Sequence, residues 1–119
     1  MGKKILIVDD AMFMRKMIRK ILEEDGYTDL EEAQDGEAAL ELFEPFDPDL
    51  VLLDITMPGK SGLEVLEELL ARRPQTKVVM CSAVAGVDGA AGIDAGRAGF
   101  IVKPFKPDEF KRTVAHYLR

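Results

Sequence analysis

The chain has 119 residues, 47% of them apolar, and its 16 Lys and Arg against 22 Asp and Glu give a formal net charge of −6. This length and composition predict one folded domain over residues 1–119 and exclude a disordered chain. The acidic balance, without a long Lys/Arg cluster, argues against nucleic acid as a partner of this domain. A lone cysteine, Cys81, excludes an internal disulfide and fits a reducing compartment.

The apolar runs of the sequence are too short for an export signal or a membrane span. Residues 5–8 follow two lysines, as in a signal peptide, but Asp9 ends this run. No other run is long enough to cross a bilayer. We therefore expect a cytoplasmic domain without membrane contact, and we expect it to be a monomer.

The first half of the chain alternates predicted strands and helices. Residues 5–8 form a continuous apolar run, which predicts a strand covered on both faces. Apolar residues at helical spacing over 14–22 predict a helix that ends near Gly26. A weaker, more polar run at 30–33 predicts an edge strand, and residues 39–43 predict a second, shorter helix.

The second half continues this alternation. Two further apolar runs, 50–53 and 78–81, predict buried strands on either side of a helix whose apolar face carries Leu63, Leu66 and Leu70. That helix should stop before the proline at position 74, because proline cannot continue a helix.

The last part of the chain contains a glycine-rich segment. Residues 86–99 should hold a helix, but five glycines interrupt it and each costs about 1 kcal/mol relative to alanine, so we expect a short or mobile helix. Residues 100–102 predict a fifth strand, and residues 107–118 a final helix with Phe110, Val114, Tyr117 and Leu118 on its apolar face. Alternating strands and helices of this kind predict a three-layer, doubly wound α/β domain.

Charged and hydroxyl residues follow these strands. They are Asp9 and Asp10 after the first strand, Asp54 after the third, Ser82 after the fourth and Lys103 after the fifth. Each residue alone has an ordinary explanation as a helix cap, a turn residue or a surface charge. In an open parallel sheet, however, ligands bind beyond the carboxyl ends of the strands, where these residues would meet.

Three clustered carboxylates need a cation or must take up protons. Two like charges about 4 Å apart repel by about 4 kcal/mol at an effective dielectric constant of 20. The available ligands are oxygens, since there is one cysteine and the single histidine, His116, lies in the last helix. Oxygen ligands favour Mg²⁺, with Mn²⁺ as a second candidate, and a partly hydrated Mg²⁺ is typical of phosphoryl-transfer sites.

Two enzyme families match the sequence poorly. Gly59-Lys60-Ser61 resembles the end of a P-loop, but that motif requires glycine where this chain has Asp54. A haloacid-dehalogenase-like phosphatase also uses an aspartate nucleophile and Mg²⁺, but it places D-x-D after its first strand, where this chain has Asp9-Asp10-Ala11.

The sequence resembles the receiver domain of two-component response regulators, most closely the single-domain chemotaxis type. The matching motifs are ILIVDD (5–10), LDITMP (53–58) with Gly62, CSA (81–83) and GFIVKPF (99–105), and the resemblance covers the whole chain. The resemblance, not the residue pattern, implies a flavodoxin-like (βα)5 fold with strand order 2-1-3-4-5. It also implies a cis peptide bond between Lys103 and Pro104.

The resemblance implies a role for each site residue. Asp54 would be the phosphoacceptor, and Lys103 and Ser82 would contact the phosphoryl group. Asp10, Asp54 and the backbone carbonyl of Thr56 would ligate Mg²⁺ directly, and Asp9 would act through water. Ser82 and Phe100 would form the switch, although Phe100 lacks the hydroxyl of the tyrosine often found at this position.

The resemblance also implies partners. The phosphoryl donor would be a phosphohistidine on a histidine kinase or phosphotransfer protein. A downstream output protein would bind the face formed by the segment 86–99, the fifth strand and the last helix, with chemotaxis as one candidate pathway. The domain would not be an enzyme beyond its own phosphorylation and dephosphorylation.

Two alternatives remain open at this stage. One is an Mg²⁺-dependent phosphatase with an aspartate nucleophile, and the other is a pseudo-receiver that binds partners without phosphorylation, because one fold can host all three functions. The complete set of acidic, serine and lysine residues argues against the pseudo-receiver, and turnover distinguishes the phosphatase.

Overall fold

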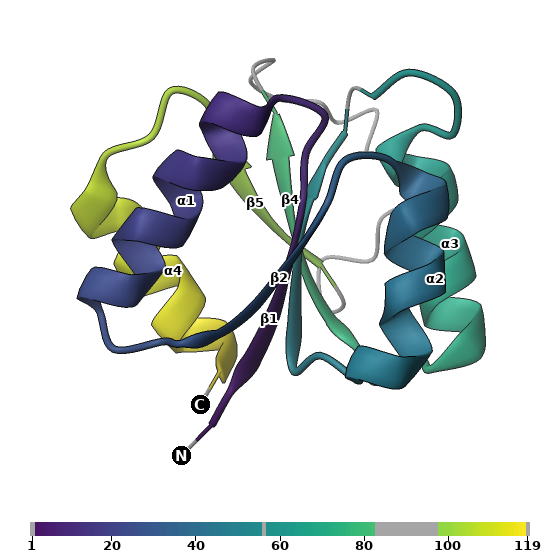
Figure 1. The fold of residues 1–119 in the computed structure, drawn as a ribbon, viewed down its shortest axis with the longest axis horizontal. Coiled ribbons are helices and arrows are strands. Elements are labelled where there is room, and N and C mark those ends of the chain that lie inside the picture. The colour runs from purple at the N-terminus through teal and green to yellow at the C-terminus, as the bar shows by residue number, and fades with distance from the viewer. Residues whose placement is uncertain (1, 56, 83–97, 119) are drawn as a thin grey trace.

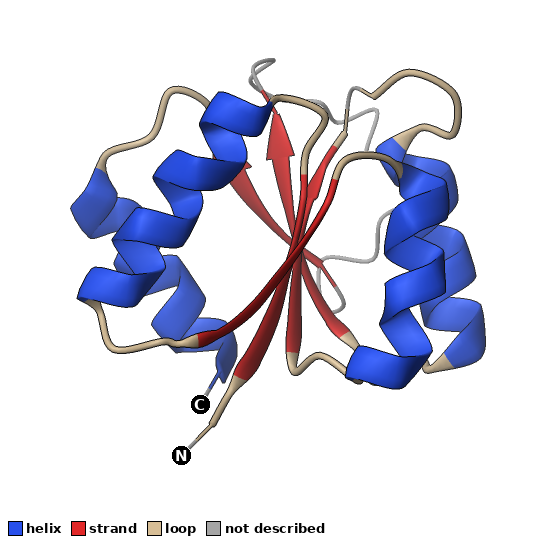
Figure 2. Cartoon of the chain, in the orientation of Figure 1, coloured by secondary structure: helices blue, strands red, loops and turns tan. Residues whose placement is uncertain are grey.

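Five parallel strands form the middle layer of the fold (Figures 1 and 2). The computed structural model describes residues 2–55, 57–82 and 98–118. The strands are β1 (Lys4–Val8), β2 (Asp29–Ala33), β3 (Leu50–Asp54), β4 (Lys77–Ser82) and β5 (Ala98–Val102). Their order is β2-β1-β3-β4-β5 with every pairing parallel, which confirms the α/β fold class, the implied strand order and the edge position of β2.

Helices cover both faces of this sheet. They are α1 (Met12–Glu24), α2 (Gly36–Phe46), α3 (Gly62–Arg72) and α4 (Pro107–Leu118). α1 and α4 lie on one face, and α2 and α3 lie on the other (Figure 1). None of the helices in the described part of the chain is long and apolar enough to cross a membrane.

The apolar core is divided in two by the sheet. Ile5 and Ile7 of β1 pack with α1 and α4, whereas Leu6 and Val8 pack with α2 and α3. Successive side chains of a strand point to opposite faces, so a strand with helices on both sides must be apolar throughout. This arrangement is the physical reason for the continuous apolar runs in the sequence.

Local sequence signals set the ends of the helices. Gly26, just beyond α1, has φ +94°, a conformation that glycine adopts without steric cost. The Asp35 side chain accepts a hydrogen bond from Ala38 N at 2.8 Å and begins α2. Ser61 and Glu64 form a reciprocal capping box at the start of α3.

Two details of the strands differ from the sequence-based expectations. Each strand is one or two residues longer than its predicted run, so Asp54 and Ser82 are the last strand residues rather than the residues that follow. Gly99, assigned above to the glycine-rich helix, lies in β5 opposite Val79. Position 98, also within that expected helix, is the first residue of β5, and positions 86–97 lie outside the described residues.

The buried face of α3 is also rotated from the predicted one. Val65, Leu66 and Leu69 are buried, whereas Leu63 and Leu70 are half-buried. A helix packed against both a sheet and α2 buries a wide stripe, and residues 63 and 70 lie at its margin.

Candidate functional site

Three carboxylates meet at the carboxyl ends of β1 and β3. Asp9 directly follows β1, and Asp54 is the last residue of β3. The two strands are neighbours in the sheet. One carboxylate oxygen from each of Asp9, Asp10 and Asp54 lies within 4.8 Å of the other two. Asp9 and Asp54 are buried, with 2% and 7% of their surface exposed, whereas Asp10 is exposed. The fold therefore brings together the three carboxylates that the sequence singled out.

Lys103 extends into this cluster from the end of β5. Its Nζ lies 2.8 Å from Asp9 Oδ2 and 3.5 Å from Asp54 Oδ1. Burial alone would lower the pKa of Lys103, but the hydrogen bond to Asp9 and the charges of both aspartates outweigh it and raise the pKa. The side chain is therefore a cation at neutral pH. The Lys103–Pro104 peptide bond is cis, as the resemblance implied.

The charges of this cluster fit a divalent cation. Three ionised carboxylates and one ammonium have a formal charge of −2, which an Mg²⁺ ion would cancel. Carboxylate oxygens are the ligands that Mg²⁺ prefers, and the exposed Asp10 leaves the site open to water and to a phosphoryl group. Asp9, Asp10 and Asp54 are the described residues that would hold the ion.

The main chain of Asp9 is held by a residue that the sequence reasoning missed. Arg15 of α1 donates a hydrogen bond from Nη1 to the Asp9 carbonyl oxygen at 2.6 Å and is itself buried. The sequence did contain a signal for this contact, because Arg15 lies three residues before Ile18 and seven before Leu22, on the apolar face of the helix. An arginine on such a face needs a buried acceptor.

Gly62 allows α3 to approach the backbone of Asp54. A Cβ atom at position 62 would overlap the carbonyl oxygen of Asp54 and lie 2.6 Å from Ile55 Cα. Gly62 N also donates a hydrogen bond to Ile55 O at 2.9 Å. The sequence included Gly62 in a motif, but this close contact between elements explains why glycine is needed there.

The remaining predicted site residues are described only in part. The backbone of Ser82 ends β4 at the same edge of the sheet, next to Cys81, which pairs with Asp54. The Ser82 side chain and the whole of Thr56 lie outside the described structure, so their roles stay predictions. Phe100 lies in β5 with 41% of its surface exposed.

Cys81 is not suited to the chemistry of this site. It is buried beneath the cluster, and burial raises the pKa of its thiol to about 12. A thiol that is protonated at neutral pH is neither a nucleophile nor a metal ligand. Cys81 is therefore a core residue, as the sequence suggested.

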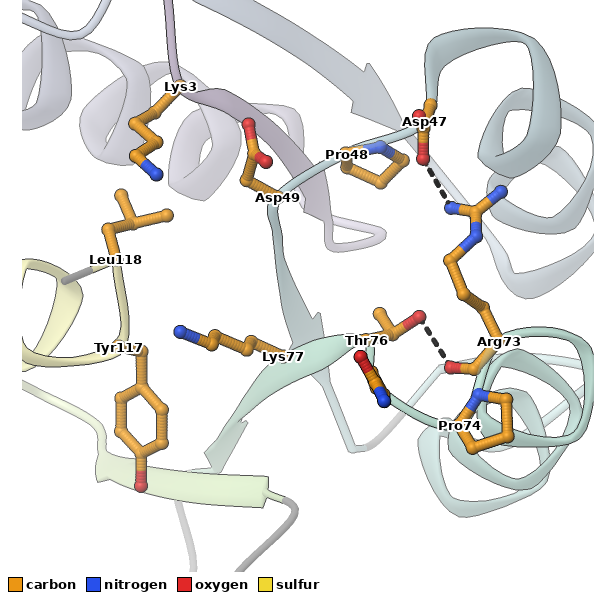
Figure 3. A pocket seen from close by; sticks show the side chains of 11 residues that line it. Lys3, Asp47, Pro48, Asp49, Arg73, Pro74, Thr76, Lys77, Tyr117 and Leu118 are labelled. Atoms are coloured by element: carbon orange, nitrogen blue, oxygen red, sulfur yellow. Dashed lines mark hydrogen bonds and ion pairs between the residues drawn. The ribbon is translucent and has the colours of Figure 1, made fainter. Parts of the chain in front are cut away.

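A cavity of about 500 Å³ lies at the opposite edge of the sheet (Figure 3). Lys3, Asp49 and Lys77, which line it, come from the amino ends of β1, β3 and β4. The ion pair of 2.6 Å between Arg73 and Asp47 closes one side. Five-residue strands separate this cavity from the carboxylate cluster by roughly 15 Å, so it takes no part in the site.

Comparison with known sequences gives a consistent assignment. A family model described as the response regulator receiver domain matches residues 5–115. The chemotaxis protein CheY of Listeria monocytogenes is 47% identical over 107 residues, which cover 88% of this chain and 89% of that protein. The chemotaxis protein CheY of Bacillus subtilis is 44% identical over 115 residues, 96% of each chain.

Solved structures show the same similarity. The Vibrio cholerae chemotaxis protein CheY4 superimposes with a TM-score of 0.89 at 28% identity, covering 99% of this chain and 100% of that one. The response regulator TrrA of Thermotoga maritima, crystallised in complex with Mg²⁺–BeF, gives a TM-score of 0.87 at 37% identity over 98% of this chain and 99% of that one. Fold, carboxylate cluster and sequence agree, and the chain belongs to the response regulator receiver domain family.

Proposed function

We propose that this chain is a phosphorylation-activated signalling switch of a two-component system, with Asp54 as the phosphoacceptor. The observation that carries the proposal is the buried Asp54 carboxylate, grouped with Asp9 and Asp10 within 4.8 Å and lying 3.5 Å from the Lys103 ammonium. A carboxylate in this setting has both a candidate cation site and the positive charge of Lys103 beside it. Both are needed by a group that accepts a dianionic phosphoryl group.

The proposed donor is a phosphohistidine on a histidine kinase or phosphotransfer protein. An Asp54 carboxylate oxygen attacks the phosphorus, and the phosphorus–nitrogen bond breaks with its electron pair left on the imidazole nitrogen. The product is an acyl phosphate on Asp54. Mg²⁺, when held by Asp10 and Asp54, would supply positive charge to the phosphoryl oxygens, and Lys103 would donate a hydrogen bond to them.

The signal ends when water attacks the phosphorus of the acyl phosphate. The bond between the phosphorus and the Asp54 oxygen breaks, which restores the Asp54 carboxylate and releases inorganic phosphate. In this proposal the chain acts on no separate substrate, so it is not an enzyme in the usual sense. Ser82 is proposed to donate a hydrogen bond to the phosphoryl group while it is present.

The proposed output surface lies between β5 and α4, where Phe100 and Val102 are 41% and 46% exposed. A hollow of about 550 Å³ on this surface is lined by Phe100, Val102 and Phe105, and also by Lys103. Phosphorylation changes the partners of Lys103, so the same residue links the carboxylate cluster to this surface. A ligand or modification shifts an equilibrium only through contacts that differ between two states, and Lys103 provides such contacts.

A downstream output protein is the proposed partner of this surface. The names of the relatives from Listeria monocytogenes and Bacillus subtilis support chemotaxis as the proposed pathway.

The proposal is tested by incubating the protein with Mg²⁺ and a small acyl phosphate, and measuring its intact mass. We expect the wild type to gain one phosphoryl group, Asp54→Asn to gain none, and Asp108→Asn, an exposed aspartate in α4, to behave as the wild type. Equal gain by Asp54→Asn would contradict the assignment of the acceptor. No gain by the wild type would favour the pseudo-receiver, and repeated turnover of phosphoesters would favour the phosphatase.

A further inference from the structure

We infer that Arg15 is a positioning residue of the carboxylate cluster: it holds the main chain of Asp9 so that Asp9 and Asp10 stay in place for the metal ion. This inference rests on the proposed function, because it concerns the same Mg²⁺ site. It adds a residue of α1 that lies outside the three carboxylates and acts through one of them.

Hydrogen bonds link both the N–H and the carbonyl group of Asp9 to β2, the first directly and the second through Arg15. Asp9 N donates to Ala33 O at 3.1 Å, and the Asp9 carbonyl oxygen accepts from Arg15 Nη1 at 2.6 Å. Arg15 Nε in turn donates to Glu32 Oε1 at 3.2 Å. Glu32 and Ala33 are the last two residues of β2. The end of one strand therefore fixes Asp9 directly through its N–H and indirectly through the guanidinium.

The turn that carries two of the carboxylates needs such support. Asp9 Oδ1 accepts a hydrogen bond from Ala11 N at 2.9 Å, with Asp10 between them. Ala11 is the N-cap of α1 and has no capping side chain, and α1 has no acidic residue in its first turn. Mutual repulsion of the clustered carboxylates pushes Asp9 and Asp10 apart in the absence of metal. The bond from Arg15 to the Asp9 carbonyl opposes this displacement.

A purely electrostatic role for Arg15 predicts the opposite effect on metal binding. The guanidinium repels Mg²⁺, so a loss of charge alone would tighten the binding of the ion. Loss of a positioning contact weakens binding, and residues that orient metal ligands typically contribute roughly 10-fold or more to affinity. The sign of the change therefore separates the two roles.

Arg19 provides a matched control on the same helix. It pairs with the same carboxylate as Arg15, with Nε 2.6 Å from Glu32 Oε2, and its Nη2 donates to Leu30 O at 3.1 Å. In the described part of the chain, the hydrogen bonds and ion pairs of Arg19 go to β2 and to Glu23, and none of them goes to Asp9. Arg19→Met thus removes a comparable set of hydrogen bonds and one positive charge without releasing the Asp9 carbonyl.

The test is calorimetric titration of the wild type, Arg15→Met, Arg15→Lys and Arg19→Met with MgCl₂. We expect Arg15→Met to raise the Mg²⁺ dissociation constant roughly 10-fold, Arg15→Lys to raise it less, and Arg19→Met to leave it within about twofold of the wild type. We also expect faster hydrogen exchange of the Ala11 amide in Arg15→Met than in Arg19→Met, because Ala11 N donates to the Asp9 side chain.

Several outcomes would overturn the inference. If the wild type binds Mg²⁺ and Arg15→Met binds it equally or more tightly, Arg15 does not position the cluster, while the proposed function stands. If Arg19→Met weakens Mg²⁺ binding as much as Arg15→Met does, the effect comes from general destabilisation of the fold and the inference is wrong. If Arg15→Met does not fold, unchanged affinity in Arg15→Lys contradicts the inference. Absence of Mg²⁺ binding by the wild type itself would remove the proposed function and this inference together.

Discussion

Lys103 contributes a positive charge to a cluster that is also the proposed site of a cation. Its ammonium lies 2.8 Å from Asp9 and 3.5 Å from Asp54, so it offsets part of the repulsion among the carboxylates. It also competes with the metal, because two cations in one cluster repel each other. One residue therefore lowers the affinity for Mg²⁺ and stabilises the phosphoryl group that Asp54 is proposed to accept.

Replacement of Lys103 by methionine separates these two effects. We expect Lys103→Met to bind Mg²⁺ about 10-fold more tightly, since repulsion between two unit charges about 4 Å apart is about 1 kcal/mol in water and larger in a buried site. We expect its phosphorylation by a small donor to be roughly 100-fold slower, because a positive charge beside the phosphoryl group is lost. Calorimetry and a mass-spectrometric time course measure the two quantities.

The control for Lys103→Met is Lys106→Met, which removes the same charge from an exposed position three residues away. It should leave both quantities unchanged. Weaker Mg²⁺ binding by Lys103→Met would mean that the ammonium organises the carboxylates more than it competes with the ion.

At the level of elements, the start of α3 fixes the backbone of the acceptor strand. The first residue of α3 is Gly62, where a Cβ atom would overlap the carbonyl oxygen of Asp54. We expect Gly62→Ala to lower the free energy of unfolding by about 2 kcal/mol or more, because backbone atoms must move apart, and to weaken Mg²⁺ binding. Urea unfolding and calorimetry measure these changes.

Ser61→Ala is the control for the start of α3. It removes the side-chain cap and should cost about 1 kcal/mol of stability, but it adds no atom near Asp54 and should leave Mg²⁺ affinity unchanged. A Gly62→Ala protein as stable as the wild type would contradict the close packing of α3 on β3.

The contact between α1 and the edge strand β2 makes stability depend on pH. Burial alone would raise the pKa of Glu32, but hydrogen bonds and charges from Arg19 and Arg15 outweigh it and lower the pKa below the usual 4.5. The carboxylate is thus more easily ionised in the folded state. Its contribution to stability is present above about pH 4.5 and is lost as the pH falls through the lower, folded-state pKa.

Glu32→Gln should remove this pH-dependent contribution. We expect its free energy of unfolding at pH 7 to be lower than that of the wild type by about 1 kcal/mol, and the difference to shrink as the pH is lowered below 4.5. Urea unfolding at a series of pH values measures it. Glu31→Gln, at the exposed neighbouring position, should match the wild type throughout. A difference that stays constant with pH would exclude an ionic origin.

At the scale of the whole molecule, the carboxylate cluster connects metal binding to folding. In sequence, α1, β2 and α2 lie between Asp9 and Asp54, and the two residues meet only when β1 and β3 pair. The unfolded chain therefore lacks the site, so Mg²⁺ bound at the proposed site would favour the folded state. By linkage, we expect an ion bound at this site to stabilise the whole fold.

Mg²⁺ at ten times its dissociation constant should raise the free energy of unfolding by about 1.4 kcal/mol. Urea unfolding with and without MgCl₂ measures this, with NaCl at equal ionic strength as the control for screening. Asp10→Asn, which removes a proposed direct ligand at an exposed position, should reduce the increase at the same MgCl₂ concentration. The same increase in Asp10→Asn would place the stabilising ion elsewhere.

Much of this fold was predictable because strand and helix signals are local. Residues 5–8 and 50–53 are short runs that are apolar at every position, which is typical of a strand covered on both faces. Asp9, Asp10, Asp54 and Lys103 were predictable as site residues, because each follows or ends such a run. The strand order came from the family resemblance, since no run of residues specifies which strand lies beside it.

The supporting residues could not be predicted in the same way. The position of Arg15 on the apolar face of its helix indicates a buried acceptor, but the sequence does not say that this acceptor is the carbonyl of Asp9 or that Glu32 of another strand holds the guanidinium. Gly62 is needed because α3 lies against Asp54, a contact between elements. Likewise, the buried face of α3 depends on how this helix packs against α2 and the sheet.

The order of residues along the chain thus established the types of element, their alternation and the kinds of side chain at the strand ends, since these follow from periodicity and from backbone conformation. Which of those side chains meet was left to the pairing of β1 with β3 and to the reach of Lys103 from β5. Charge interactions and hydrogen bonds act over a few ångströms in space, regardless of separation in sequence. For that reason the chemistry of the cluster, and the support that Arg15 gives it, became visible only in the folded arrangement.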